Sequence, residues 1–389
     1  MKALIFDTDN QEWATSRGFE LRDVATPVLD ETHNQSDADA VLIKVHYAGV
    51  CGSDRGIWMR SAFRDQILQS IAAQDRGKRY RIIGHELFGE IVGKGSRVNT
   101  LAIGDRVTCE SHVVCNQCYQ CLRGEKHVCT NEKILGISQD GGFAELIKVP
   151  SHIVWKTNTS NIRPEVAVMQ EPFGNAVHAA SKTDLHGKTI AIFGLGPIGL
   201  FLTLIAKQRG AKKIIGIDPN PQAREMAMRM GIDHCVALLP ADGGTQETVR
   251  PYAHNQRLIE EIMKLTDMIG VDVSFEMAGF NSSVNNCLYA TRRGGEVVLF
   301  GIKNGDSVIE DYNRLIVRGL TLHCVIGRQI WQTWETVRML LEDTSNGIQK
   351  NIFDMMLNKG IDTIIPIVEY SKEVFERKMA LYPKILIKF

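Results

Sequence analysis

The chain has 389 residues, of which 44% are hydrophobic and 23% charged, and its 45 basic residues balance 45 acidic ones. This length exceeds what one hydrophobic core usually fills, so two domains are expected. The balanced charge excludes a general attraction to nucleic acid or to an acidic membrane surface. No apolar stretch has the length of a signal peptide or a membrane span. We therefore expect a cytoplasmic protein, whose nine cysteines indicate metal binding or catalysis and argue against a disulfide framework.

Short strands punctuated by glycine characterise the chain up to about residue 155. The clearest examples are residues 40–50 (AVLIKVHYAGV), 89–95 (GEIVGKG), 104–109 (GDRVTC) and 141–150 (GGFAELIKVP). This spacing predicts a compact all-β unit in the form of a small barrel.

Strands then alternate with amphipathic segments of helical length. The β-α-β-α-β order is predicted at 188–194, 196–210, 213–218, 220–231 and 234–238, with further strands at 271–279, 294–302 and 320–327. The alternation predicts a doubly wound α/β domain over 171–327, with a parallel sheet covered on both faces. The polar residues 240–256 are expected to form a surface loop.

A GxGxxG sequence, formed by Gly194, Gly196 and Gly199, lies between a predicted strand and a predicted helix, and Asp218 ends the next strand. In this context the glycines provide the tight turn, the close approach and the helix packing of a dinucleotide site. The Asp218 carboxylate can accept hydrogen bonds from a ribose diol but repels a 2′-phosphate, which favours NAD over NADP. The alternatives are a glycine-rich turn that binds nothing and an Asp218 that only caps a helix.

Four cysteines lie in one short polar loop, with gaps of two, two and seven residues: Cys115, Cys118, Cys121 and Cys129. They could bind zinc, bind an iron–sulfur cluster or remain free thiols. Four Zn–S bonds would order a loop that has little apolar material of its own. An iron–sulfur pattern would continue with a short gap and Cys-Pro, whereas Thr130 follows here. Zinc is favoured, and a site of four thiolates has no vacant position for chemistry.

Three further segments carry candidate ligands: GVCGSD with Cys51, GHE with His85 and Glu86, and EPFGNAVHA with Glu171. Taken singly, a cysteine is often a small buried hydrophobe and a histidine is often a hydrogen-bonded core residue. Taken together, they match a family.

Over essentially its full length, the chain resembles the zinc-dependent medium-chain alcohol dehydrogenases, most of all the threonine 3-dehydrogenase and polyol dehydrogenase branch. Besides these three segments, the matching motifs are GDRV, the four-cysteine lobe, GLGPIG and GLTLHCVIGRQIWQTWE. The resemblance implies a GroES-like catalytic domain at 1–170 with a structural zinc lobe. It also implies a Rossmann NAD-binding domain at 171–327 and a segment at 328–389 that returns to the catalytic domain. A homo-oligomer is implied too, with a tetramer favoured.

The resemblance makes Cys51 and His85 ligands of a catalytic zinc, with Glu86 and Glu171 as nearby carboxylates of which either can ligate. One thiolate and one carboxylate neutralise Zn²⁺ while water or substrate holds the open place. The metal would polarise the substrate oxygen, and hydride would pass to the nicotinamide.

Other residues near these motifs have two interpretations each. Ser53 is the first acceptor of the alcohol proton or a turn serine, and the histidine that relays this proton in relatives is replaced by Gly56. His112 matches a position that borders the substrate pocket in threonine dehydrogenases, or it is structural. Glu110 either meets a cationic amino group or is solvated, and Cys109 is expected to be packed.

The resemblance also extends the cofactor site beyond the glycine turn. The added positions are Ile198, Gly301, Ile302, Val325 and Ile326. An arginine that lies five residues past the acidic ribose ligand in relatives is displaced to Arg224, six past Asp218.

The segment between Cys51 and His85 is longer than the threonine dehydrogenase pattern needs. Phe63, Ile67, Leu68 and Ile71 fall on one face of a predicted amphipathic helix. The basic residues around it are either a solvated surface or a rim that guides an anionic substrate.

The sequence thus predicts a zinc- and NAD-dependent enzyme that interconverts a secondary alcohol and a ketone, with a threonine-like amino alcohol or a polyol as substrate. The alternative enzyme is a sugar or cyclitol dehydrogenase, with a substrate that could be phosphorylated. From other classes, an iron–sulfur electron carrier and a non-catalytic NAD sensor remain open.

Overall fold

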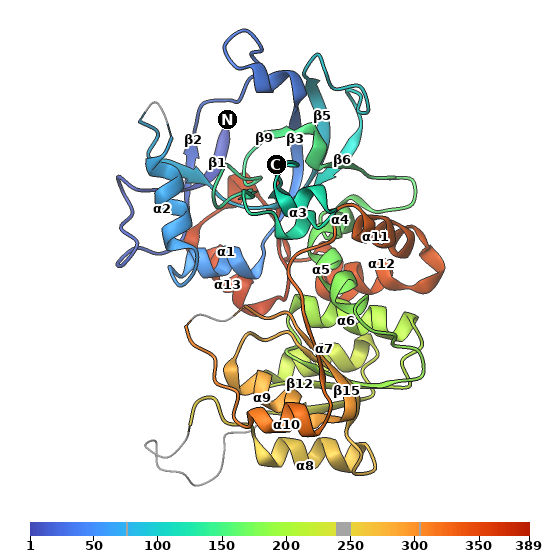
Figure 1. Cartoon of the computed structure of the whole chain (residues 1–389). Coiled ribbons are helices and arrows are strands. Elements are labelled where there is room, and N and C mark those ends of the chain that lie inside the picture. Colours follow the sequence, from blue (N-terminus) through green and yellow to red (C-terminus); the bar gives the residue numbers. More distant parts are fainter. Residues whose placement is uncertain (75–76, 239–249, 303–304) are drawn as a thin grey trace. The chain divides into compact units, whose positions relative to one another are not determined.

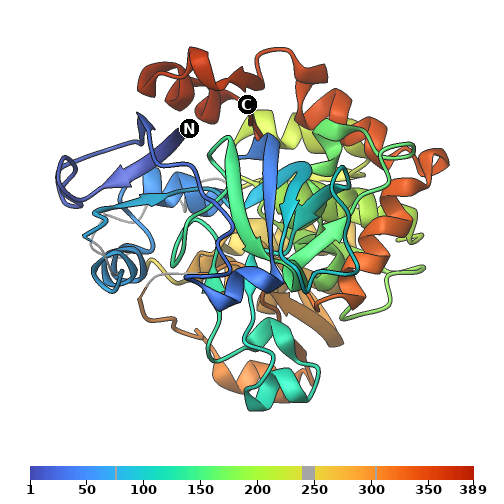
Figure 2. The ribbon, with the colours of Figure 1, turned by 90° about the horizontal axis from the view of Figure 1, so that it is seen from above.

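The computed structural model describes residues 1–74, 77–238, 250–302 and 305–389. The chain divides into two compact units, Met1–Pro172 together with Gln329–Phe389 (unit 1) and Phe173–Arg328 (unit 2). Both termini therefore belong to unit 1, where Figure 2 marks them. Within the described ranges, every helix is too short or too polar to cross a bilayer.

Unit 1 contains two large β-sheets of different size, which confirms that strands predominate in the first part of the chain, but the unit also has helices and is therefore not all-β. A three-stranded sheet has the order β2-β1-β4, and a seven-stranded sheet has the order β10-β6-β5-β3-β18-β17, with β9 also paired to β3. The strands are β1 (Lys2–Asp7), β2 (Glu20–Asp23), β3 (Ala40–Gly49), β4 (Tyr80–Ile82), β5 (Glu86–Lys94), β6 (Arg106–Cys109), β9 (Leu146–Pro150), β10 (Val154–Lys156), β17 (Ile364–Pro366) and β18 (Leu386–Lys388). A separate two-stranded antiparallel sheet pairs β7 (His112–Val113) with β8 (Lys133–Ile134).

The strand pairing of unit 1 brings distant parts of the chain together. β3 pairs antiparallel with β5, so that Gly49 lies opposite Glu86, and with β18, so that Gly49 also lies opposite Leu386. The C-terminal segment thus returns to the sheet of the first domain (Figure 1). The helices of unit 1 are α1 (Gly52–Trp58), α2 (Arg64–Ala72), α3 (Tyr119–Leu122), α4 (Pro164–Ala167), α11 (Gln332–Glu342), α12 (Ile348–Asn351) and α13 (Lys372–Leu381). Helix α5 (Gln170–Ala180) begins in unit 1 and continues into unit 2.

Unit 2 is a doubly wound α/β domain, as predicted. Its six strands have the order β13-β12-β11-β14-β15-β16 and are all parallel. They are β11 (Thr189–Phe193), β12 (Lys213–Asp218), β13 (His234–Ala237), β14 (Val271–Glu276), β15 (Thr291–Leu299) and β16 (Thr321–Cys324). The Ile- and Val-rich runs of the central strands are buried because helices cover a parallel sheet on both faces.

The helices of unit 2 follow the strands in the expected alternation. They are α6 (Pro197–Gln208), α7 (Pro221–Met230), α8 (Gln256–Leu265), α9 (Asn281–Ala290) and α10 (Tyr312–Val317). Helices α8 and α9 are in contact, and their apolar residues form one core cluster with Ala191, Ile215 and Val297 of the sheet. Most of the loop predicted at 240–256 lies outside the described residues, and α8 begins at its end.

The long segment after Cys51 forms α2, the predicted amphipathic helix. Ile67 and Ile71 are buried in the unit 1 core, against which Phe63 and Leu68 also pack. The basic residues around this helix that the structure describes all have partners. Arg60 donates to Ser16 and to two backbone carbonyls, Arg64 faces Asp65, Arg79 pairs with Asp9, and Lys78 and Arg81 both pair with Asp140. These contacts offset only part of the positive charge, because Arg60 forms no salt bridge with a described residue and Lys78 and Arg81 share Asp140. Arg76 lies outside the described residues, so the basic rim stays a prediction.

Candidate functional site

The four cysteines of the lobe converge, although they are spread over a loop of unit 1. Their sulfur atoms all lie within 4.8 Å of one another, with 3.5 Å between the Sγ atoms of Cys115 and Cys129 and 3.8 Å between those of Cys118 and Cys129. None of the four forms a disulfide. Short helix α3 carries Cys121, and Cys118 precedes its first residue. The spacing of two residues thus places successive sulfurs on one side of a tight turn, which suits a tetrahedral metal.

The thiols of the lobe differ in pKa. Backbone N–H groups, first that of Cys121, lower the pKa of Cys118 to about 5. Burial and the neighbouring thiols raise the pKa of Cys121 to about 12. Without a metal the four groups must share protons, and a divalent cation would replace those protons. The donor set therefore fits a structural zinc.

Cys51, His85 and Glu86 form a second cluster, with ligand atoms within 4.8 Å of one another. Cys51 follows β3 and caps the N terminus of α1, while His85 immediately precedes β5 and Glu86 is its first residue. Because β3 and β5 pair, two segments that are far apart in sequence meet here. Gly49 makes room for the acid, since a Cβ at this position would lie 2.3 Å from Glu86 Oε2.

Glu171 lies beside this cluster but outside the group of three. It is buried at the start of α5, and Ser111 Oγ donates a 2.7 Å hydrogen bond to its Oε1. Its negative charge acts on both His85 and Glu86. The geometry thus brings all four predicted ligands of the catalytic metal into one electrostatic environment, with Glu86 nearer to Cys51 and His85 than Glu171 is.

Asp54 completes the cluster, and sequence reasoning missed it. Its Oδ2 accepts a 2.9 Å hydrogen bond from the Cys51 N–H, and its Oδ1 lies 3.6 Å from His85 Nδ1. The charge of this carboxylate acts on the ring, and Ser53 Oγ lies 3.3 Å from His85 Nε2. The Cys-x-x-Asp spacing of a helix cap was the available signal.

The titratable groups of the cluster have shifted pKa values. Burial raises the pKa of Asp54 and of Glu86. Burial alone would lower the pKa of His85, but Asp54 and Cys51 outweigh it and raise that pKa well above its ordinary value. Within the described chain, the buried Glu86 Oε2 accepts no well-aligned hydrogen bond. A thiol, an imidazole and carboxylates form a donor set that zinc accepts, so these residues fit a catalytic zinc.

Two cations beside the cluster, the buried Lys384 and the half-buried Arg55, were also missed. Lys384 Nζ donates to Glu86 Oε1 at 2.5 Å, and both side chains are almost fully buried. Arg55 donates to the backbone carbonyls of Tyr382 and Pro383, and it interacts electrostatically with Cys51 and Glu86. Neither cation belongs to a sequence motif, because both contacts join the first domain to the C-terminal segment.

His112 is held by an acidic partner. Its Nδ1 lies 2.7 Å from Glu132 Oε2, and its N–H donates to Glu110 Oε1. Glu110 is itself only 1% exposed and accepts a hydrogen bond from Trp334 Nε1, so the expectation that it is solvated is wrong. Cys109 is buried, as expected, and burial raises the pKa of its thiol.

In unit 2, the glycine turn has the geometry that a dinucleotide site needs. Gly194 has φ of +101°, and a Cβ on Gly199 would lie 2.0 Å from the Gly194 carbonyl oxygen. Gly196 is open, because a Cβ added there would meet no atom of the described chain within 4 Å. The turn therefore requires glycine at its first and third positions and leaves free space at the second, where a pyrophosphate approaches.

Asp218 fixes this turn instead of capping a helix. Its Oδ2 accepts from Leu195 N–H and its Oδ1 from Asn220 N–H, both at 2.8 Å. Asn220 is the residue that caps α7. Arg224 donates to the backbone carbonyls of Asp218 and Pro219, which places it at the same end of β12.

The remaining predicted cofactor residues lie at or just beyond the carboxyl ends of the strands of unit 2. Ile198 is in the first turn of α6, Gly301 and Ile302 follow β15, and Val325 and Ile326 follow β16. Ile302 is 78% exposed, whereas Val325 is buried. In open parallel sheets this is the edge at which ligands bind.

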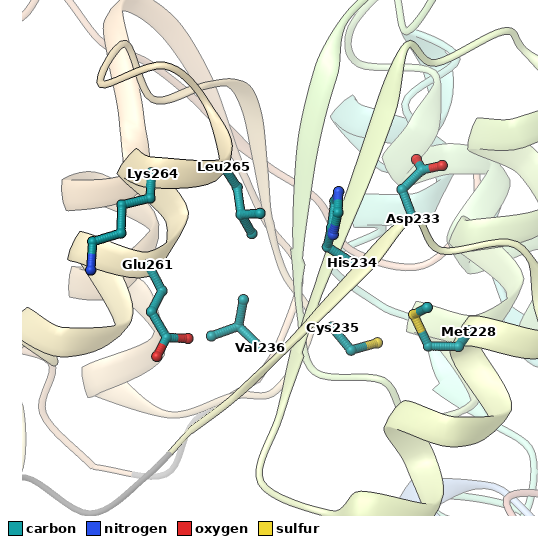
Figure 3. Close-up of a pocket in the computed structure, with 8 residues that line it drawn as sticks. All are labelled: Met228, Asp233, His234, Cys235, Val236, Glu261, Lys264 and Leu265. Carbon is teal, nitrogen blue, oxygen red and sulfur yellow. The ribbon is translucent and has the colours of Figure 1, made fainter.

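A separate open pocket of about 580 Å³ lies along β13 of unit 2 (Figure 3). Its lining comes from the end of α7, from β13 and from α8, with side chains that include His234, Cys235 and Glu261. No residue of the predicted cofactor site lines it. This pocket is therefore distinct from the residues with metal or nucleotide chemistry.

Comparisons with known proteins agree with this geometry. Residues 37–159 match the alcohol dehydrogenase GroES-like domain, and residues 197–343 match the zinc-binding dehydrogenase family. An L-threonine 3-dehydrogenase of Pyrococcus horikoshii is 37% identical over 302 residues, which cover 78% of this chain and 80% of that protein. The L-threonine 3-dehydrogenase of Bacillus subtilis is 32% identical over 355 residues, which cover 91% and 90%.

Solved structures show the same fold. The alcohol dehydrogenase TADH from Thermus sp. ATN1 superposes with a TM-score of 0.78 over 100% of this chain and 99% of that one, at 22% identity. Galactitol-1-phosphate dehydrogenase from Escherichia coli gives a TM-score of 0.76 over 100% of both chains, also at 22% identity.

Proposed function

This chain is an enzyme of the zinc-binding medium-chain alcohol dehydrogenase family, and from this membership we propose that it oxidises a secondary alcohol to a ketone, reversibly, with NAD and zinc. One observation carries the proposal. Cys51, His85 and Glu86 place their ligand atoms within 4.8 Å of one another, beside the buried carboxylate of Glu171. Two buried carboxylates, a thiol and an imidazole thus lie in one environment, and together they form a donor set that can hold a zinc ion.

In the proposed mechanism, Cys51 and His85 hold the metal together with a carboxylate from Glu86 or Glu171. Bound zinc supplies a Lewis acid for the alcohol oxygen. The charge of Asp54 acts on His85, and Ser53 Oγ, at 3.3 Å from His85 Nε2, is placed to take the alcohol proton. Bound NAD would supply the acceptor for the hydride of the carbinol carbon, which would become the carbonyl carbon of the ketone.

The glycine turn and Asp218 support NAD as the cofactor. Gly196 leaves space for a pyrophosphate at the N terminus of α6, whose N–H groups favour negative charge. The Asp218 carboxylate would accept hydrogen bonds from a ribose diol and repel a 2′-phosphate. We expect Ile198, Arg224, Gly301, Ile302, Val325 and Ile326 to complete the site.

For the substrate, a threonine-like amino alcohol or a polyol is proposed. The two threonine dehydrogenases, at 37% and 32% identity, favour the amino alcohol. His112 and Glu132 form a pair one residue from Ser111, which contacts Glu171, so they are suited to polar recognition near the metal. A phosphorylated substrate is the alternative, since Lys78 and Arg81 near α2 share one acidic partner, Asp140.

A substrate panel tests the proposal. Zinc-loaded protein is incubated with NAD⁺ or NADP⁺ and with threonine, other amino alcohols, sugar alcohols, cyclitols and their phosphates, and reduction is followed at the nicotinamide absorbance. We expect reduction of NAD⁺ by at least one secondary alcohol, with NADP⁺ much poorer. Binding of NAD without reduction by any alcohol would favour a sensor, and iron with acid-labile sulfide in place of zinc would favour an electron carrier.

A further inference from the structure

A lysine is buried against one of the proposed metal ligands. The Lys384 ammonium lies 2.5 Å from both Glu86 oxygens, with side-chain exposures of 1% for Lys384 and 0% for Glu86. A buried lysine is rare because its desolvation must be compensated by a close anion. Glu86 is therefore already in contact with one cation, the Lys384 ammonium, in the absence of a metal.

The position of Lys384 is fixed by the fold. The preceding carbonyls of Tyr382 and Pro383 accept hydrogen bonds from Arg55 at 2.9 and 3.2 Å. The following residue, Ile385, accepts a 3.0 Å hydrogen bond from Val50 N–H, one residue before Cys51. These anchors fix the backbone of Lys384 next to the pairing of β18 with β3, and the buried side chain extends from there to Glu86.

The two cations near the cluster are placed differently. Lys384 contacts both Glu86 oxygens directly, whereas Arg55 donates to backbone carbonyls and interacts with Cys51 and Glu86 only electrostatically. A metal held by Cys51, His85 and Glu86 would be a second cation on the same Glu86 carboxylate.

Resting on the proposed function, we propose that Lys384 competes with the metal for Glu86 and thereby weakens zinc binding at the catalytic cluster. Its ammonium occupies the carboxylate that could otherwise close the coordination sphere, so Glu171 is left to act as the ligand and a place stays open for the substrate. Lys384 is thus a positioning residue, which acts on the metal through Glu86.

The decisive variant is Lys384→Met, which keeps most of the side-chain length but removes the ammonium. Zinc affinity of the catalytic cluster is measured by competition with a chelator, with the thiolate lobe left loaded. We expect the zinc dissociation constant to fall by about tenfold or more, the scale on which groups around the ligands change metal affinity. Co²⁺ bound at the same cluster should show altered visible absorption bands, because Glu86 enters its coordination sphere.

Three further variants separate competition from other effects. Lys384→Arg keeps the charge and should leave the dissociation constant within about threefold of the parent. Arg55→Gln removes a nearby positive charge but can still donate to the carbonyls of Tyr382 and Pro383, so it should tighten zinc binding by less than about threefold. Glu86→Gln combined with Lys384→Met should restore the parental cobalt bands.

The outcomes are distinct. Unchanged or weaker zinc binding by Lys384→Met would overturn the competition, as would an equal gain in Arg55→Gln, which would show a general charge effect. Circular dichroism and thermal unfolding identify a variant that fails to fold. If Lys384→Met does not fold, the cobalt spectra of Lys384→Arg and Glu86→Gln decide: both should match the spectrum of the parent protein, because Glu86 is not a ligand in either. A parent that binds no zinc at the cluster would instead remove the proposed function itself.

Discussion

The thiolate lobe and the buried cluster are two candidate metal sites of the same unit, and they are built in opposite ways. The lobe takes its four ligands from residues 115–129, and the side chains around it are largely exposed. The cluster takes Cys51 from the cap of α1, His85 and Glu86 from the start of β5 and Glu171 from α5, and Asp54, Lys384 and Arg55 interact with it. The lobe is a local structure that a metal would order, whereas the cluster is a product of the tertiary fold.

This difference suits the lobe to a structural role and the buried cluster to a chemical one. Four thiolates complete a tetrahedron and leave no vacant position, so the lobe can stabilise but not catalyse. One thiolate, one imidazole and competing carboxylates leave a position that a substrate can use. The buried counter-charges then decide how strongly the metal is held.

The largest effect is expected from Cys51→Ser. Loss of the thiolate should remove metal from the cluster and reduce kcat/KM by about three orders of magnitude or more, because the alcohol oxygen loses its Lewis acid. Steady-state kinetics and zinc analysis measure the change, and NAD binding in unit 2 should be unaffected. A variant that stays active without zinc at the cluster would contradict the account.

A change in the lobe should act on stability instead of chemistry. Cys118→Ser removes the thiol with the lowered pKa and should release the lobe metal, which lowers the free energy of unfolding by about 3 kcal/mol or more. Thermal unfolding measures this loss. At a temperature where the variant is still folded, kcat should change little; a loss of kcat in fully folded protein would mean that the two sites are not separate in function.

Asp54→Asn tests the group behind the ligands. Asparagine can still accept the Cys51 N–H, but it loses the charge that faces His85 Nδ1. We expect zinc affinity to fall by about 10- to 100-fold with little change in thermal unfolding of the zinc-loaded protein. Chelator competition provides the measurement, and unchanged affinity would show that Asp54 only caps α1.

Glu296 and its hydrogen-bond donors in unit 2 form a charged cluster that has no proposed metal, so this cluster is a control for the effects of charge on stability. Burial would raise the pKa of Glu296, but hydrogen bonds from Lys188, Thr183 and His323 lower it to about 2. A carboxyl whose pKa is lowered in the folded state stabilises the protein at pH values above its unfolded pKa, near about 4.3. This stabilisation is lost as the pH falls from about 5 to 2.

Glu296→Gln should therefore lower the free energy of unfolding of unit 2 at neutral pH by about 1–2 kcal/mol and flatten its dependence on pH between about 5 and 2. Denaturant unfolding over that range checks this. Zinc affinity at the cluster should not change, and an equal loss at every pH would show that the carboxylate is not the stabilising group.

Local patterns in the sequence were sufficient to predict much of the fold and of the lobe. The Ile- and Val-rich strands, the glycine turn and the 2-2-7 cysteine spacing each act over short stretches, and the structure has the corresponding elements. Glu110 and Lys384 could not be predicted in the same way. Glu110 meets Trp334, and Lys384 meets Glu86 at a separation of 298 residues. Such contacts depend on how the C-terminal segment returns to β3, which no short pattern records.

Anomalous diffraction at the zinc absorption edge, from crystals of catalytically active, zinc-loaded protein, tests the central claim most directly. We predict one peak among the four sulfurs of the lobe and a second peak bonded to Cys51 and His85. Active crystals with a peak at the lobe and none beside Cys51 would contradict a catalytic metal at the buried cluster.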